Sequence, residues 1–325
     1  MALSLTEKEV TTRDYLKADG GKAWDIFFSD SFLLNYFIKS KKGIYTLMDG
    51  GEYAKVPLMY DGAEAGFYLE GDNLSSDDRP IVNAARFQIK HAYSNATITR
   101  IVELANSGAQ QDIDLLVQKV EAGQKQLSKT LAGSLYDAPG GSAARLTGLR
   151  ALCNETTTTA YGNIQEADLV SDDGTTPWEG KMYATAETIK LDTYRDLKRK
   201  AKVSDGPKGK PNFCVTTETL WNTTESILSV QQRFVKEGAE TAKAGFSGIY
   251  VAGMEVFPDD YCPASHIFAL NENYIGFAIW RQGNFYRMPW AIIEGTAGDQ
   301  TTKFLFDGNL ICSNRKAHQG YSNVS

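Results

Sequence analysis

The sequence is poor in the residues on which catalytic and metal-binding sites depend. Its 325 residues include only three histidines: His91, His266 and His318. None belongs to a cluster typical of a zinc or iron site, so we interpret all three as ordinary surface or core residues. Residues 245–248 fall short of the GxSxG pattern of a nucleophile elbow, and residues 206–210 lack the GxxxxGKS/T spacing of a phosphate loop. The sequence therefore predicts no catalytic, cofactor-binding or metal-binding residue, and no enzyme.

Cysteine pairs and long apolar runs are also lacking. The four cysteines form no CxxC pair, which argues against a zinc knuckle or a redox motif: Cys153, Cys214, Cys262 and Cys312. We expect them to be reduced and mostly buried, as is usual inside cells. The most apolar stretches, such as Ile275–Trp280, are far too short to span a bilayer, and nothing near the first residues resembles a signal peptide. We expect a soluble, intracellularly made protein without membrane contact.

Positive charge is not in excess. The chain has 34 lysines and arginines against 40 aspartates and glutamates, which gives a net charge of −6. A dedicated nucleic-acid binder is usually basic, because its affinity comes largely from neutralising phosphates. The strongest basic run, from Arg195 to Lys210, could be a phosphate-binding patch, but we favour a solvated helix end, where cations are stabilised by the helix dipole. Such a chain could lie close to nucleic acid without binding it tightly.

What is present is the composition of an ordinary globular protein. Hydrophobic residues make up 42% and charged residues 23% of the chain, and the length allows one large domain or two modest ones. Segments with helical spacing alternate with segments of strand-like alternation. The sequence therefore predicts an α+β fold with a sizeable core.

A long β-hairpin is indicated in the first third of the chain. The strand-like runs are Ile44–Met48, Val56–Tyr60 and Arg86–Tyr93. Residues 61–84 between them are polar and punctuated by glycine. Alternation with period two places Phe87, Ile89 and Tyr93 on one apolar face. A two-stranded hairpin is marginal in water by itself, so we expect it to lie on another surface.

One long amphipathic helix follows. Ser107 is a candidate N-cap, with Gln110 three residues later. Apolar residues then recur at helical spacing: Ile113, Leu116, Val117, Val120, Leu127, Leu131 and Leu135. A helix from Ala109 to Tyr136 would be on the order of 40 Å long, at ~1.5 Å per residue. Gly123 lies on or near its apolar face, where it either allows close packing or is tolerated at a cost of about 1 kcal/mol.

The remaining segments complete the pattern. Residues 1–43 are interpreted as an arm with a short helix, whose aromatic residues dock on the same chain or on a neighbour. These aromatic residues are Trp24, Phe27, Phe28, Phe32, Tyr36 and Phe37. A helix over about 185–203, a buried strand at Phe213–Thr216 and a helix from Thr217 to about Lys236 predict a compact α/β layer. The last third is rich in strands, and the final two candidates are Thr302–Phe306 and Asn309–Asn314.

The order of these elements resembles the major capsid protein of tailed bacteriophages, which has the Hong Kong 97 fold. The segment Gly248–Val256, followed by Pro258, is similar to the strand pair usual in that family. The resemblance covers nearly the whole chain and implies five parts. They are an N-terminal arm (1–43), an E-loop hairpin (44–99), a P-domain with the spine helix (100–144), an A-domain (145–285) and return strands of the P-domain (286–325).

The resemblance also implies a function. The protein would be a structural head protein that assembles with itself, as hexamers and pentamers, into an icosahedral shell around a double-stranded DNA phage genome. It implies separate scaffold and portal proteins and a possible decoration protein, DNA enclosed without sequence-specific binding, no cofactor and no membrane. The chain would be part of the virion and would be assembled in the host cytoplasm.

Two alternatives remain open from the residues. An encapsulin-like nanocompartment would share the fold and enclose protein cargo in place of DNA. An α+β enzyme would be a monomer or dimer with a single deep polar pocket.

Overall fold

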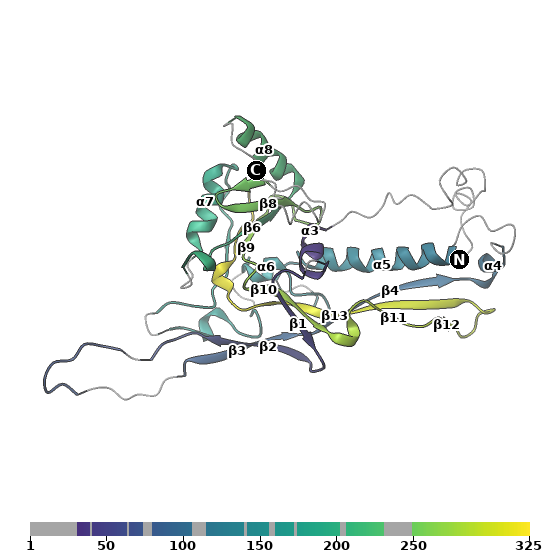
Figure 1. Ribbon diagram of the computed structural model, residues 1–325, viewed down its shortest axis with the longest axis horizontal. Coiled ribbons are helices and arrows are strands. Elements are labelled where there is room, and N and C mark those ends of the chain that lie inside the picture. The colour runs from purple at the N-terminus through teal and green to yellow at the C-terminus, as the bar shows by residue number, and fades with distance from the viewer. Residues whose placement is uncertain are drawn as a thin grey trace. The chain divides into compact units, whose positions relative to one another are not determined.

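The computed structural model describes residues 31–39, 41–63, 65–73, 80–105, 115–139, 142–155, 160–171, 174–201, 206–230 and 249–325 (Figure 1). Residues 1–30 of the predicted arm, the candidate cap Ser107 and the segment 231–248 lie outside this part. The chain divides into two compact units. Among the described residues, unit 1 comprises 91–105, 115–131 and 282–307, and unit 2 comprises the remainder.

Helices and strands are mixed along the described chain, as the sequence predicts. The α-helices are α3 (Phe32–Leu34), α4 (Arg100–Ala105), α5 (Leu115–Ser134), α6 (Leu149–Leu152), α7 (Leu191–Lys200) and α8 (Glu218–Val230). The strands up to residue 258 are β1 (Ile44–Met48), β2 (Tyr53–Met59), β3 (Val82–Gln88), β4 (Lys90–Ile98), β5 (Lys181–Tyr183), β6 (Phe213–Thr216), β7 (Ile249–Val251) and β8 (Met254–Pro258). The later strands are β9 (Ile267–Leu270), β10 (Ile275–Trp280), β11 (Tyr286–Arg287), β12 (Ala291–Ile292), β13 (Gln300–Cys312) and β14 (Gln319–Tyr321).

The predicted α/β layer is a six-stranded sheet in unit 2, in the order β5-β14-β9-β6-β8-β7. Strand β6 is buried along its whole length and pairs in parallel with β8 and antiparallel with β9. The helix predicted over about 185–203 spans only Leu191–Lys200, and it turns Tyr194 and Leu197 into the core next to this sheet. The hydroxyl groups of Tyr194 and Thr224 are 2.8 Å apart and join α7 to α8. Apolar burial on both helices therefore explains why this layer is compact.

Strand β1 belongs to a different sheet from the hairpin. It pairs in parallel with β10, and β10 pairs antiparallel with residues 308–312 of β13. The backbones approach so closely that a Cβ at Gly276 would lie only 1.9 Å from the carbonyl oxygen of Ile44. Ile44–Met48 is therefore not part of the hairpin, which begins at Tyr53. The domain boundaries stay predictions.

The two strands predicted at the end of the chain are in fact one. Strand β13 continues through Asp307 and Gly308 without a turn, so the separation was wrong. Its first half pairs with β11 and β12 in unit 1, and its second half pairs with β10 in unit 2. A change of partner strand, with no break in the strand itself, produced the apparent boundary in the sequence.

The three described aromatic residues of the predicted arm, Phe32, Tyr36 and Phe37, dock on their own chain. The Phe32 ring stacks on Phe257 with 4.0 Å between centroids, and the Phe37 ring lies 6.0 Å from that of Phe277. The Asp259 carboxylate accepts hydrogen bonds from the Ser31 hydroxyl and the Leu33 amide. For this part of the arm, the same-chain alternative is therefore correct.

The four cysteines are free and buried, as predicted. Burial raises the pKa of Cys153 and of Cys312 to about 12. Thiols with such a pKa are almost entirely protonated at neutral pH and are poor nucleophiles, which fits a structural role.

Gly123 permits close packing in unit 1. It is buried in α5, and a Cβ at this position would lie 2.7 Å from the Phe304 ring. Gly133, in the same helix, has open space around the corresponding point. Of the two interpretations of Gly123, the structure therefore supports close packing.

These two glycines give a matched pair of substitutions. We expect Gly133→Ala to raise the free energy of unfolding by about 0.5–1 kcal/mol, because alanine favours a helix over glycine. We expect Gly123→Ala to lower it by about 1–2 kcal/mol, because the buried Phe304 ring must shift. Urea unfolding measures both values. Equal stabilisation by the two substitutions would show that the contact with Phe304 does not restrict Gly123.

His318 makes the stability of the subunit depend on pH. Burial lowers the pKa of His318 to about 3, and its Nδ1 atom accepts a hydrogen bond from the Asn271 amide. In the unfolded chain His318 takes up a proton as the pH falls below about 6.5, whereas in the native chain it stays neutral until the pH is near 3. The free energy of unfolding therefore falls as the pH drops from about 6.5 towards 3. We expect His318→Asn, which keeps an acceptor, to remove up to about 1.4 kcal/mol per pH unit from this slope. Urea unfolding between pH 7 and pH 4 measures it, and identical slopes would contradict the assignment.

Candidate functional site

The hairpin of β2 and β3 forms a two-stranded sheet of its own in unit 2. Its register runs from Tyr53 opposite Gln88 to Met59 opposite Val82. One face of the hairpin is buried: Ala54, Leu58, Ala85 and Phe87. The other face is exposed, so the base of the hairpin follows the one-sided pattern that the sequence predicts.

The buried face rests on a loop of the same unit. The Arg86 amide donates a 2.8 Å hydrogen bond to the Gly162 carbonyl, and the Phe87 and Tyr161 rings form a T-shaped pair with 5.3 Å between centroids. Gly162 has a φ of +62°, and a Cβ there would lie 3.0 Å from the Cβ of Ala85. Glycine suits this position for both reasons, because it adopts positive φ easily and leaves room for β3.

A buried arginine holds this loop in place. The guanidinium of Arg315 donates to the carbonyl oxygens of Leu152, Ala151 and Trp178 at 3.0–3.1 Å and to Glu166 at 3.2 Å. The Cζ atom of the Arg315 guanidinium lies 4.7 Å from the centre of the Tyr161 ring. The Glu166 carboxylate also accepts from the Asn154 side chain and the Gly180 amide. A buried charge is tolerated only when it is paired and hydrogen-bonded, and these partners meet that condition.

Beyond the base, the connecting loop exposes apolar residues. Phe67 is fully exposed, and Tyr68 and Leu69 are 68% and 77% exposed. The loop is locally ordered by the Asp72 carboxylate, which accepts a 2.6 Å hydrogen bond from the Leu69 amide. The sequence predicts a polar segment here, and this prediction was wrong at Phe67, Tyr68 and Leu69. The available signal was three consecutive apolar residues between Gly66 and Gly71.

The predicted apolar face of the second strand was wrong at one residue. Phe87 and Ile89 are buried, but Tyr93 is 69% exposed. Strand β3 ends at Gln88 and β4 begins at Lys90, and in β4 the buried positions are Ser94, Ala96 and Ile98. The break at Ile89 shifts the alternation by one residue and turns Tyr93 outwards.

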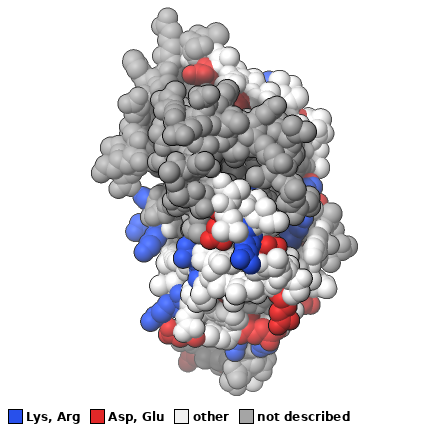
Figure 2. Space-filling model, turned by 90° about the vertical axis from the view of Figure 1, so that its right-hand side faces the viewer, with Lys and Arg blue, Asp and Glu red and all other residues white. Residues whose placement is uncertain are grey.

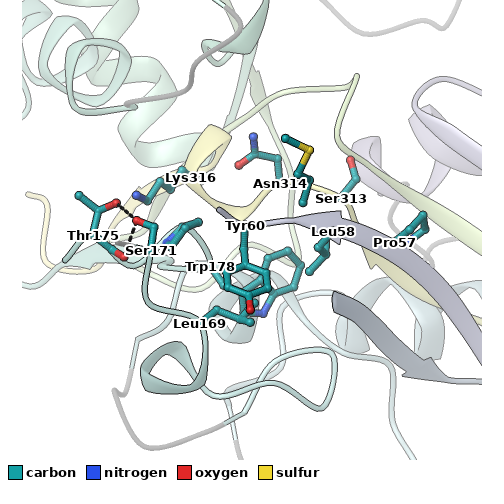
Figure 3. A pocket seen from close by; sticks show the side chains of 12 residues that line it. Pro57, Leu58, Tyr60, Leu169, Ser171, Thr175, Trp178, Ser313, Asn314 and Lys316 are labelled. Atoms are coloured by element: carbon teal, nitrogen blue, oxygen red, sulfur yellow. Dashed lines mark hydrogen bonds between the residues drawn. The ribbon is translucent and has the colours of Figure 1, made fainter. Parts of the chain in front are cut away.

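A hollow lies beside the base of the hairpin, with a volume of about 360 Å³. Figure 3 shows Ser313, Asn314 and Lys316 along one side and Leu169, Tyr60 and Trp178 along the other. Residues of β2, the loop 169–178 and the chain after β13 contribute to it. Trp178 is fixed by a hydrogen bond from its indole nitrogen to the Tyr161 carbonyl. The hollow is therefore built on the same Arg315 cluster as the hairpin base.

Three basic side chains of the run Arg195–Lys210 have partners within the chain. On the described atoms in Figure 2, basic and acidic side chains are interspersed. In the basic run, Lys198 donates to the carbonyls of Ala252 and Gly253, and Arg195 and Arg199 pair with Asp192 and Asp196. These contacts support the helix-end interpretation of the run over a phosphate-binding patch.

The histidines are dispersed in the structure. His91 lies 2.7 Å from Asp307 in unit 1, while His266 and His318 are buried in unit 2. Within the described residues, no group of histidine, cysteine, aspartate and glutamate side chains is arranged to hold a metal ion. In the same part of the chain, no helix is both long enough and apolar enough to cross a membrane.

Removing Arg315 tests the support of the hairpin base. We expect Arg315→Met to lower the free energy of unfolding by about 3–5 kcal/mol, because it leaves Glu166 and several buried carbonyls without their donor. Adding Glu166→Gln should restore part of the loss by removing the unpaired charge. Urea unfolding measures both variants. A loss below about 0.5 kcal/mol would show that the cluster does not support the structure.

The chain was compared with known proteins. No family model matches it, and a search of curated proteins gives no match. Among solved structures, the capsid asymmetric unit of cyanophage A-1(L) aligns with a TM-score of 0.72 at 15% identity, over 97% of this chain and 99% of that chain. The capsid of a native GTA particle aligns with a TM-score of 0.61 at 12% identity, over 95% and 98%.

A third similar structure is the holo-SrpI encapsulin complex from Synechococcus elongatus PCC 7942. It aligns with a TM-score of 0.56 at 9% identity, over 100% of this chain and 97% of that chain. The likeness to all three runs from end to end, and at these identities it concerns the fold. The chain therefore has the predicted α+β fold of the Hong Kong 97 type, which these capsid and encapsulin proteins share.

Proposed function

We propose that this protein is the subunit of a closed shell, a major capsid protein that assembles into an icosahedral head around double-stranded DNA. The observation that carries the proposal is the β2–β3 hairpin, whose base is held by its own chain and whose loop exposes Phe67, Tyr68 and Leu69. An exposed apolar cluster on a projecting loop indicates a protein–protein contact. The fold shared with two capsid structures supports the same conclusion.

Assembly would rest on many weak contacts that closed symmetry combines. Each hairpin loop would lie on a neighbouring subunit, and copies would form hexamers and pentamers. The net charge of −6 suits a container, because a wall that repels phosphate does not hold the DNA that must move past it. The arm, P-domain and A-domain would keep the boundaries predicted from the sequence, whereas the E-loop hairpin would begin at Tyr53.

The finer parts of the proposal concern partners and place. A separate scaffold protein, a portal protein and a possible decoration protein would complete a head that is assembled in the host cytoplasm and becomes part of the virion. The protein would act without catalysis. The fold shared with the capsid structures favours this view over an α+β enzyme.

An encapsulin-like shell is the second candidate, and the likeness to the encapsulin from Synechococcus elongatus favours it. The two candidates differ in cargo, which is DNA for a head and protein for a nanocompartment. Electron microscopy of the purified protein, with the particle contents assayed for DNA and protein, tests both. A monodisperse monomer at micromolar concentration, with scaffold present, would contradict the shell function.

Shortening the hairpin loop separates folding from assembly. We expect replacement of residues 62–79 by Asn-Gly to leave the free energy of unfolding within about 1 kcal/mol, because the described loop residues are exposed and a short turn can join β2 to β3. The shortened subunit should not form closed shells. Urea unfolding and electron microscopy measure the two effects. Normal shells would show that the loop has no part in assembly.

A further inference from the structure

We infer that the hollow beside the hairpin base receives the loop segment Phe67–Glu70 of a second copy of this chain. The inference rests on the proposed shell function and specifies one of its contacts. The hollow has a volume of about 360 Å³, within the range of roughly 300–1,000 Å³ that proteins use to enclose small ligands. The partly exposed ring of Tyr60 offers aromatic surface on which the rings of Phe67 and Tyr68 can pack, and the buried Trp178 supports the floor of the hollow.

The loop does not fill the hollow of its own chain, because Phe67, Tyr68 and Leu69 are exposed and do not line it. Met59 lines the hollow, and Phe67 follows it eight residues later, at the far side of the loop from β2. Eight extended residues span roughly 26 Å, at ~3.3 Å each. Figure 1 traces the loop onwards from the ends of β2 and β3 and away from them. A loop that leads away from its own hollow is placed to meet the surface of another copy.

Charge complementarity supports the same occupant. Among the described residues that line the hollow, Lys316 is the only charged one. In the loop, the exposed Glu70 and Asp72 follow the apolar residues directly, and no basic residue lies between Asp61 and Asp72. An apolar segment that enters the hollow would therefore bring a carboxylate to the lysine at its mouth. Such a pair contributes little affinity by itself and selects the orientation of the contact.

The contact would be heterologous, because the loop of one copy meets a different surface of the next. Heterologous contacts generate rings when the rotation between copies closes. The hollow and the hairpin base both rest on the Arg315 cluster, so donor and receptor surfaces are fixed to one rigid support within each subunit.

Disulfide trapping between two singly substituted proteins tests the contact. One protein carries Tyr68→Cys in the loop and the other carries Asn314→Cys in the hollow, while the four native cysteines are buried and free. A disulfide requires Cα atoms about 4.4–6.8 Å apart, so its formation reports direct proximity. After co-assembly and mild oxidation, we expect covalent dimers on a non-reducing gel. Each protein assembled alone is the control and should give none.

The outcomes separate this contact from the shell function. Closed shells without mixed dimers, also with the second pair Leu69→Cys and Thr175→Cys, would overturn the inference and leave the shell function intact. Dimers from the Tyr68→Cys protein alone would indicate contact between loops and would also overturn it. A wild-type protein that never assembles would overturn the shell function itself.

Substitutions at the contact give a second readout. We expect Phe67→Ser to raise the subunit concentration needed for assembly at least about tenfold, whereas Phe67→Leu, which keeps the apolar surface, should have a much smaller effect. We expect Glu70→Lys and Lys316→Glu each to raise it between about 1.5-fold and 5-fold, and the double reversal to restore it. Additive effects of the two reversals would contradict a direct pairing of these residues.

Discussion

A two-stranded hairpin buries too little apolar surface to keep its own shape, and this constraint organises much of unit 2. Its base is stable because the face with Leu58 and Phe87 lies on the loop around Tyr161, which the buried guanidinium of Arg315 holds. Burying that charge is costly, and the cost is met by four protein oxygens and two aromatic rings. The position of the hairpin therefore depends on a residue far from it in the sequence.

This arrangement divides the hairpin into a fixed part and an exposed part. The base contributes to the core of its own subunit, whereas the loop with Phe67 leaves apolar surface in water. That surface has a cost in the isolated subunit, which contact with a neighbour would remove. A rigid base lowers the entropy lost when the loop binds, because the loop is presented in a restricted position. Folding and assembly are thus assigned to different residues of one element.

The sequence predicts the elements whose signal is local. Helical spacing correctly predicted the buried Leu127 and Leu131 of α5, and Phe213–Thr216 was correctly predicted to be a buried strand. The errors come from non-local pairing: β1 pairs with β10, and β13 changes partner without ending. A one-residue break at Ile89 was enough to place Tyr93 on the wrong face. The role of Arg315 was not predictable, because nothing in its local sequence shows that it is buried among carbonyl oxygens.

Hydrogen exchange tests most directly the claim that the base is held by its own chain and the loop by a neighbour. Amide protection would be measured in dissociated subunits and in assembled shells. The account predicts that amides of β3, such as that of Arg86, are protected in both states, whereas amides of residues 65–73 gain protection only on assembly. Unchanged exchange of the loop in shells, or an unprotected β3 in the free subunit, would contradict it.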